Sequence, residues 1–123
     1  MIGETITSED FASIEMDENY FKYCVFENLS PEGKTICSDF NACSFKAVDW
    51  YWGLFTQCNF IQCQFTDCTF RGAAFPDCRF IDCAMTNCQF VKDSLDGDCS
   101  FDRTIAYNCV IKACVGFGAA IGL

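Results

Sequence analysis

Residues 38–97 read SDFNA CSFKA VDWYW GLFTQ CNFIQ CQFTD CTFRG AAFPD CRFID CAMTN CQFVK DSLDG, and this stretch decides the fold. Each group of five has a large apolar residue, usually Phe, at its centre. Two places earlier stands a small residue, most often Cys. An internal repeat indicates that one structural unit is copied along an axis, so it outweighs local secondary-structure propensities.

A period of five fits neither regular secondary structure. Apolar residues recur about every three to four positions in an amphipathic helix and about every two in a strand. Within each five, the small and the central residue are two positions apart and point the same way, as in a short strand. The polar pair that follows marks a corner. Four such sides close a square coil of twenty residues, and successive coils would stack through parallel main-chain hydrogen bonds about 4.8 Å apart.

Residues twenty positions apart are therefore predicted to form interior columns, with Phe55, Phe75 and Leu95 as one of them. The predicted core contains the central residues and the stacked cysteines. These are Phe40, Phe45, Trp50, Phe55, Phe60, Phe65, Phe70, Phe75, Phe80, Met85, Phe90 and Leu95, with Cys43, Cys58, Cys63, Cys68, Cys78, Cys83 and Cys88.

These groups of five resemble the pentapeptide repeat family, whose motif centres on a large apolar residue with a small one two places before it. Here the repeat is a cysteine- and phenylalanine-rich variant, CxF. The resemblance implies an all-β fold, a right-handed quadrilateral parallel β-helix. The number of fives predicts about five coils.

The whole chain is predicted to be one domain, because the repeat continues on both sides of the regular stretch. We expect an N-terminal cap at 1–8, first repeats at 9–28, a protruding loop at 29–37, regular repeats at 38–97, a one-residue insertion at Asp98, last repeats at 99–114 and an apolar tail at 115–123. The loop is predicted because Ser-Pro-Glu-Gly-Lys breaks the count.

The twelve cysteines are predicted to be reduced core residues. A cysteine-rich short chain usually indicates a secreted disulfide scaffold. Here, however, cysteine alternates with phenylalanine, and a buried thiol behaves as a small hydrophobe. Stacked parallel side chains also rarely give the torsion of about 90° that a disulfide needs. The start, MIGETITSED, has neither the basic nor the apolar region of a signal peptide, so we expect a cytoplasmic protein without a membrane span.

The charge is unevenly distributed. The net charge is −9, and residues 1–32 contain eight acidic side chains and one basic side chain, a balance of −7. An acidic surface repels nucleic acid and attracts basic protein surfaces. Direct nucleic-acid binding is therefore not expected. The alternative interpretation is a solubility face that blunts the open end of the coil stack.

No catalytic site, metal or cofactor is expected. General acid–base catalysis uses His or a carboxylate in a cleft, but the chain has no His and a filled β-helix has no pocket. The cysteines point inward, and no C-x-x-C pair exists to bind zinc. Asp93, Asp96 and Asp98 only faintly suggest a calcium loop, because Leu95 takes the third position and the distal Glu is missing.

Six outward positions are candidates for a protein interface: Tyr51, Trp52, Arg71, Asp67, Asp77 and Asp82. Tyr51 is predicted to lie over Arg71, and Trp52 over Gly72. Either the two aromatic residues form a binding hot spot with a stacked cation, or Trp52 covers the gap that glycine leaves. The three aspartates are predicted to cluster in an acidic stripe.

The apolar tail contains four candidates for dimerisation: Val115, Phe117, Ile121 and Leu123. A β-helix has to cover its open end, or its edge strands recruit another chain. The tail therefore either folds over the last coil or pairs with a second copy. The family resemblance favours a homodimer, because several family members associate through their C-terminal ends.

Function follows less directly from the repeat than the fold does. The favoured interpretation is a non-enzymatic cytoplasmic scaffold that binds an unidentified protein. Family members that protect DNA gyrase and topoisomerase IV from quinolones or peptide toxins imply the alternative, an acidic DNA mimic that binds a type II topoisomerase. The two differ in salt dependence, because salt screens charge mimicry much more than apolar contact.

Overall fold

The computed structural model describes residues 1–117, which form one short helix and fifteen short strands. The helix is α1 (Ser8–Ser13). The strands are β1 (Thr5–Ile6), β2 (Asp17–Lys22), β3 (Val25–Glu27), β4 (Thr35–Asn41), β5 (Ser44–Lys46), β6 (Asp49–Tyr51), β7 (Leu54–Phe55), β8 (Asn59–Ile61), β9 (Gln64–Thr66), β10 (Thr69–Arg71), β11 (Arg79–Ile81), β12 (Ala84–Thr86), β13 (Gln89–Val91), β14 (Ile105–Tyr107) and β15 (Val110–Lys112).

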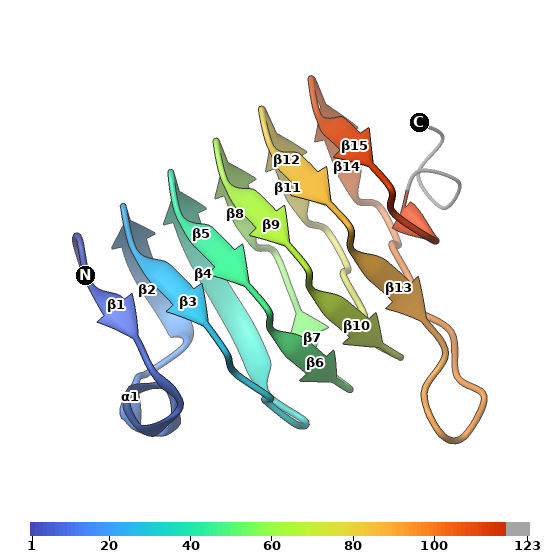
Figure 1. The fold of residues 1–123 in the computed structure, drawn as a ribbon, viewed down its shortest axis with the longest axis horizontal. Coiled ribbons are helices and arrows are strands. Elements are labelled where there is room, and N and C mark those ends of the chain that lie inside the picture. The colour runs from blue at the N-terminus through green and yellow to red at the C-terminus, as the bar shows by residue number, and fades with distance from the viewer. Residues whose placement is uncertain (118–123) are drawn as a thin grey trace.

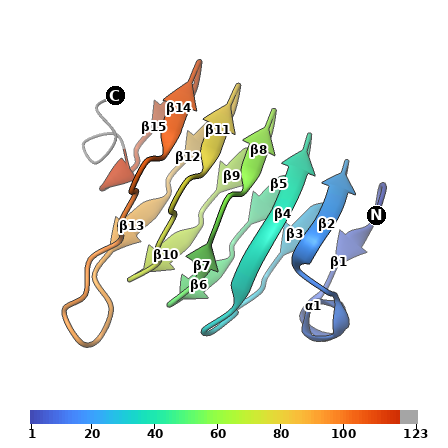
Figure 2. The same cartoon turned by 180° about the vertical axis from the view of Figure 1, so that it is seen from behind.

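The strands wind into a four-sided coil (Figures 1 and 2). The first side contains β2, β4, β8, β11 and β14, the second β1, β3, β5, β9, β12 and β15, and the third β6, β10 and β13. The fourth side contains β7, which pairs with β4, and isolated parallel bridges. In Figure 1 the coil advances from left to right. The strands of the second side lie in front and point downward, and those of the first side lie behind and point upward, so the coil is right-handed; Figure 2 shows the same coil from behind.

The predicted fold class is thereby confirmed: the molecule is a right-handed quadrilateral β-helix with parallel sheets. The five strands of the first side span four complete turns. In the regular part, the register joins residues twenty positions apart. The register pairs Phe40 with Phe60 and Phe80, Phe45 with Phe65 and Met85, and Trp50 with Phe70 and Phe90.

In the regular part of the coil, the corners are made by residues in the left-handed region of backbone conformation, which explains the period of five. From Gln57 to Asn87 every fifth residue has a φ of 53–58°. This conformation turns the chain sharply, and Gly, Asn and Asp adopt it most readily. The corner N–H remains hydrogen-bonded, as Gln62 shows by donating to the Ile81 carbonyl of the next coil at 2.9 Å.

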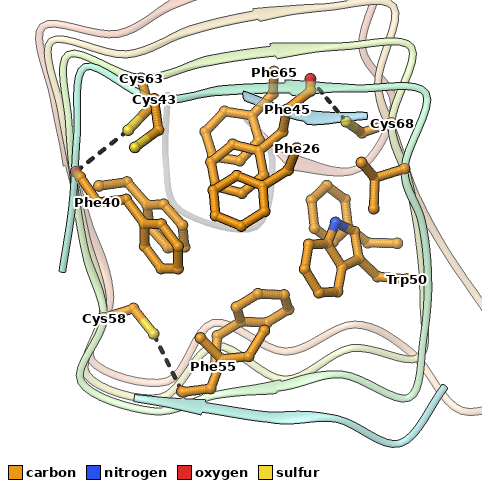
Figure 3. Packing of buried hydrophobic residues seen from close by; sticks show 14 of the residues in the cluster. Phe26, Phe40, Cys43, Phe45, Trp50, Phe55, Cys58, Cys63, Phe65 and Cys68 are labelled. Carbon is orange, nitrogen blue, oxygen red and sulfur yellow. Dashed lines mark hydrogen bonds between the residues drawn. The ribbon is translucent and has the colours of Figure 1, made fainter. Parts of the chain in front are cut away.

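The phenylalanine rings fill the coil in parallel stacks. Phe60 lies between Phe40 and Phe80, with ring centroids 5.0 and 4.8 Å away and interplanar angles of 5° and 7°. Neighbouring columns meet edge to face, as Phe60 does with Phe65 at 66°. Figure 3 shows the stack of Phe26, Phe45 and Phe65 in the same interior. Burying one such side chain contributes about 1.5–3 kcal/mol to the stability of the folded state. Each coil repeats this contribution.

The inward cysteines donate weak hydrogen bonds to carbonyls of the preceding coil (Figure 3). Cys58 Sγ lies 3.2 Å from the Ile36 oxygen, and Cys63 Sγ lies 3.3 Å from the Phe40 oxygen. Ser38, one coil before Cys58, also donates to a main-chain carbonyl, at 2.7 Å. Where the motif position is Cys or Ser, its side chain thus adds one donor to the main-chain hydrogen bonds. All twelve cysteines are free thiols in the structure.

The start of the chain departs from the predicted repeats. Residues 9–13 were expected to begin the first repeats, but they belong to helix α1. Phe11 projects from this helix into the core and meets Trp50 edge to face, with ring centroids 5.8 Å apart. The physical reason lies in Pro31, which accepts a hydrogen bond from the Tyr51 N–H and so lies one coil before Trp50. Proline has no large side chain to fill the interior at this place. The ring of Phe11 supplies the missing apolar group.

The predicted protruding loop at 29–37 is also wrong. Leu29 and Ile36 are buried, 2% and 0% exposed, and the segment continues directly into β4. Ile36 and Phe40 are successive inward residues only four positions apart, one fewer than the regular spacing of five. No residue of this corner has the left-handed conformation that the other corners use. One strand therefore runs through the corner, and the count shifts without any projection.

The regular repeats end earlier than predicted. Phe101, and not Leu95, stacks on Phe75, with centroids 5.1 Å apart and rings nearly parallel at 2°. The spacing is twenty-six positions instead of twenty, so six residues are inserted instead of one. Leu95 is 80% exposed. The physical reason is that Cys99 and Phe101 supply a complete small-x-large pair, and an aromatic ring extends the stack better than a leucine.

The two ends of the coil differ. Helix α1 packs on the N-terminal end through Phe11. At the C-terminal end Phe117, fully buried, meets Phe80 and Phe101 edge to face. Within residues 1–117 no strand lies beyond β14 and β15. Their outward residues Tyr107 and Val110 are 70% and 56% exposed.

Candidate functional site

Residues 92–98 leave the coil at the corner between the third and fourth sides. In Figure 1 they project beyond β13 as a loop. Side chains of preceding coils hold this segment, and we name it the anchored loop. It is the largest interruption of the twenty-residue register in residues 1–117.

Asp93 fastens the anchored loop. Its Oδ1 accepts hydrogen bonds from the N–H groups of Leu95 and Gly97, both at 2.8 Å. Its Oδ2 accepts a hydrogen bond from Nε1 of Trp52 at 2.7 Å. These bonds, the one from Gly97 foremost, hold the pKa of the Asp93 carboxyl below its ordinary value. One charged group thus joins the loop to itself and to a tryptophan two coils earlier.

Two further residues of the earlier coils complete the anchor. The Ser94 N–H donates a hydrogen bond to the hydroxyl oxygen of Tyr51 at 2.8 Å. Gly72 leaves room for the loop, because a Cβ at this position would collide with the Asp93 carboxylate. The corner conformation alone does not require glycine, since Ala42 adopts it with a φ of 53°. Asp93 is therefore the reason for glycine here.

The anchored loop presents one large apolar side chain to solvent. Leu95 is 80% exposed, and Trp52 at the base of the loop is 38% exposed. Lys92 and Asp96 form an exposed ion pair, with Nζ and Oδ1 3.3 Å apart. Asp98 is exposed as well. The arrangement offers a single apolar contact on a main chain whose position is already fixed.

The predicted interface residues on the third side have a supporting role. Tyr51 and Arg71 are register partners, as expected, but Arg71 Nε donates to Asp49 Oδ1 at 3.2 Å. The rings of Tyr51 and Trp52 meet edge to face, with centroids 4.4 Å apart. Both aromatic residues use their polar atoms to hold the anchored loop. The gap at Gly72 is filled by Asp93, which Trp52 then binds.

The predicted acidic stripe is wrong. Asp67, Asp77 and Asp82 are corner residues with φ of 53–56°. Since successive corners are five residues apart, the three aspartates occupy three different edges of the coil. Each also has a partner on the next coil, at 2.7 Å: Asn87 donates to Asp67, Arg103 to Asp77 and Asn108 to Asp82. Their carboxylates line the corners and do not form one face.

The dimerisation candidates are separated by the structure. Val115 is 56% exposed and forms a parallel bridge with Gln89. Phe117 is buried in its own core, so the prediction that it contacts a second copy is wrong. Its ring is used to cover the last coil. Ile121 and Leu123 lie outside the described residues.

Residues 1–117 contain no group of three or more His, Cys, Asp or Glu side chains that could hold a metal ion. No helix within this range has the length and apolar character needed to cross a membrane. The anchored loop is therefore the candidate site that the geometry favours.

Comparison with known proteins agrees with the repeat. Residues 54–92 match the family model for pentapeptide repeats, in eight copies. Residues 54–92 are therefore pentapeptide repeats. Curated proteins give no match. Two similar solved structures are trypsin-treated forms of QnrB1, a plasmid-mediated fluoroquinolone resistance protein. The first is 13% identical to this chain, with a TM-score of 0.33, and the match covers 85% of this chain and 73% of the QnrB1 chain. The second is 11% identical, with a TM-score of 0.29, and the match covers 85% of this chain and 70% of the QnrB1 chain.

The sequence contained a signal for the anchored loop, although the strict count of five concealed it. DSLDG (93–97) has neither a small residue at its start nor an aromatic centre, whereas Cys99 and Phe101 restore the motif. Asp and Gly are also typical of turns. The bond between Asp93 and Trp52 had no such signal, because it joins residues forty-one positions apart.

Proposed function

We propose that this pentapeptide repeat protein is a non-enzymatic scaffold that binds another protein through the anchored loop. The 80% exposure of Leu95 carries the proposal, because the main chain around it is held by Asp93 and Tyr51. We place the protein in the cytoplasm, where reducing conditions keep its twelve thiols free.

Pre-organisation is the physical reason for favouring this loop. Fixing the backbone of one residue costs about 1–2 kcal/mol of conformational entropy. A loop that is already fixed avoids part of this loss when it binds. Removal of the apolar Leu95 side chain from water then stabilises the complex. The stacked coil supports the loop rigidly, because ring columns and parallel ladders run beneath it.

Photo-cross-linking tests the proposal. The photoreactive residue p-benzoylphenylalanine replaces Leu95 in one variant and Ile2 in a control variant, whose position is 67% exposed at the N-terminal end of the coil. We expect one protein to be cross-linked from position 95 only, and to bind the unmodified chain after purification. Equal labelling from both positions, or a binder that tolerates Leu95→Ala, contradicts the proposal.

The charge supports a second candidate function, an acidic DNA mimic that binds a type II topoisomerase. The net charge is −9, and residues 1–32 account for −7 of it. A basic DNA-binding groove would attract this end. In a DNA gyrase supercoiling assay, salt-sensitive inhibition or rescue from a quinolone would support the mimic. No effect at high protein excess would contradict it.

The C-terminal end supports a homodimer. The outer edges of β14 and β15 have no strand partner within residues 1–117, and Tyr107 is 70% exposed. Open strand edges recruit other strands. Since α1 packs on the opposite end, association through one end would stop at two copies. Sedimentation should show a dimer for the wild-type chain and a monomer for Tyr107→Asp; equal masses contradict the idea.

A further inference from the structure

The exposed surface of the anchored loop combines one apolar side chain with an excess of negative charge. Residues 92–98 contain Lys92 and three aspartates, Asp93, Asp96 and Asp98, so their net charge is −2. Lys92 is paired with Asp96. Asp93 stays ionised at neutral pH, because its hydrogen bonds keep its pKa low. Two carboxylates near Leu95 thus have no basic partner among the described residues.

We propose that the partner presents a narrow apolar pocket for Leu95 with basic side chains at its border, an inference that rests on the proposed function. The shape indicates a pocket, because Leu95 projects at 80% exposure between Ser94 and Asp96. A broad flat apolar surface would bury these two polar neighbours without partners, which is unfavourable. A pocket that admits one side chain leaves them at its solvated border.

The carboxylates determine the charge of that border. Asp93 and Asp98 are two and three residues from Leu95, so their Cα atoms are at most about 7 and 10 Å from its own. These distances are comparable with the Debye length of about 8 Å at physiological salt. Basic side chains around the pocket would steer the partner to the loop and speed association. Nucleic acid does not fit this surface, because its phosphates would face the same carboxylates.

The chemistry of the surface can be tested with a small host molecule. The probe is β-cyclodextrin, a sugar ring with an apolar cavity, in its neutral form and in a form with amino groups on the rim. We expect the Leu95 methyl NMR signals to shift more with the amino form, and salt to abolish the difference. Equal shifts with both hosts overturn the basic border, and no shift of Leu95 overturns the pocket. The methyl signals of Ile2, which is 67% exposed, serve as the control.

Binding variants separate this inference from the proposed function. With the protein cross-linked from position 95 as ligand, Leu95→Ala should raise Kd on the order of tenfold to a hundredfold. Asp98→Asn should slow association and flatten its salt dependence, and Ile2→Ala should do neither. Finding no specific binder overturns both proposals. A binder that responds to Leu95→Ala, but not to salt or Asp98→Asn, keeps the function and overturns the basic border.

Discussion

Trp50 and Trp52 are two residues apart, yet they belong to the two regions that differ most, the packed coil and the anchored loop. Trp50 is 1% exposed and stacks on Phe70, and its Nε1–H has no hydrogen-bond partner among the described residues. Trp52 is 38% exposed, and its Nε1–H donates to Asp93. Ring packing positions the first tryptophan, and one hydrogen bond positions the second.

The difference shows how stability is distributed in this protein. In the coil, each layer repeats the same ring stack and the same parallel ladder, so many equivalent contacts share the free energy. In the anchored loop, the position of seven residues depends on the carboxylate of Asp93 and the hydroxyl of Tyr51. Substitutions should therefore act globally in the coil and locally in the loop.

The largest expected contrast is between Phe60→Ala and Leu95→Ala. Phe60 is buried between two rings, so truncation leaves a cavity and should lower the free energy of unfolding by about 3–5 kcal/mol. Leu95 is 80% exposed, and its truncation should change stability by less than about 0.5 kcal/mol. Urea unfolding measures both. Similar losses for the two variants would contradict the distinction between coil and loop.

Gly72→Ala should disturb the boundary between the two regions. The added Cβ collides with Asp93, and overpacking of this kind costs about 1–3 kcal/mol unless the loop moves away. Ala42→Gly is the control, because it measures what a Cβ contributes in the same backbone conformation at another corner. The NMR signal of the Trp52 indole N–H should shift in the Gly72 variant only. An unchanged signal together with unchanged stability would show that Asp93 does not require glycine.

Cys58→Ala and Cys58→Ser test what the coil needs from its cysteines. Cys58 donates to a carbonyl as Ser38 does one coil earlier. Losing the donor should lower the free energy of unfolding by about 1 kcal/mol, and serine should lose less than alanine. Thermal unfolding compares the two variants. A larger loss for serine would mean that apolar packing, and not hydrogen bonding, selects cysteine.

Alkaline pH should weaken the coil. Burial raises the pKa of the Cys99 and Cys114 thiols above the ordinary value. The folded state therefore keeps these protons longer than the unfolded state, so their contribution is complete below the ordinary pKa of about 8.5. It is lost as pH rises through the folded values. Urea midpoints measured from pH 7 to 10 should fall at the alkaline end, and Cys99→Ser should reduce the fall.

Acid should release the anchored loop with the smallest effect on global stability. The pKa of Asp93 is lowered in the folded state, so its contribution is complete above the ordinary value of 3.8 and is lost as pH falls through the folded value. Amide exchange at Leu95 and Gly97 should accelerate there while the coil stays protected. Asp93→Asn should show fast exchange already at neutral pH. Protection that is independent of Asp93 would contradict the anchor.

Most of the fold could be predicted because the repeat is local. Phe60 and Phe80 stack where the count of five placed them, and the cysteines of their motifs, Cys58 and Cys78, point inward beside them. The count failed where another segment could fill the same space better. Phe11 fills the core near Pro31, and Phe101 takes the stacking place assigned to Leu95. A fixed period cannot anticipate such competition, because it compares each residue only with its neighbours.

The candidate site could be predicted only in part. Tyr51 and Trp52 stood out because aromatic residues at outward corners are unusual, and both belong to the anchor. Asp93 was considered only as a cation ligand, and its actual partners are amide and indole N–H groups. The acidic stripe failed because Asp67 and Asp82 turn to different edges at successive corners.

The sequence by itself determined the square coil, the columns of rings and the inward thiols. These features follow from a repeating contact between residues twenty positions apart, which any regular stretch of the motif reproduces. Only the tertiary structure decided where Leu95 points and what holds it there. That outcome depends on a carboxylate meeting an indole from two coils earlier. This hydrogen bond forms only in the folded coil, because winding of the chain brings the two groups within hydrogen-bonding distance.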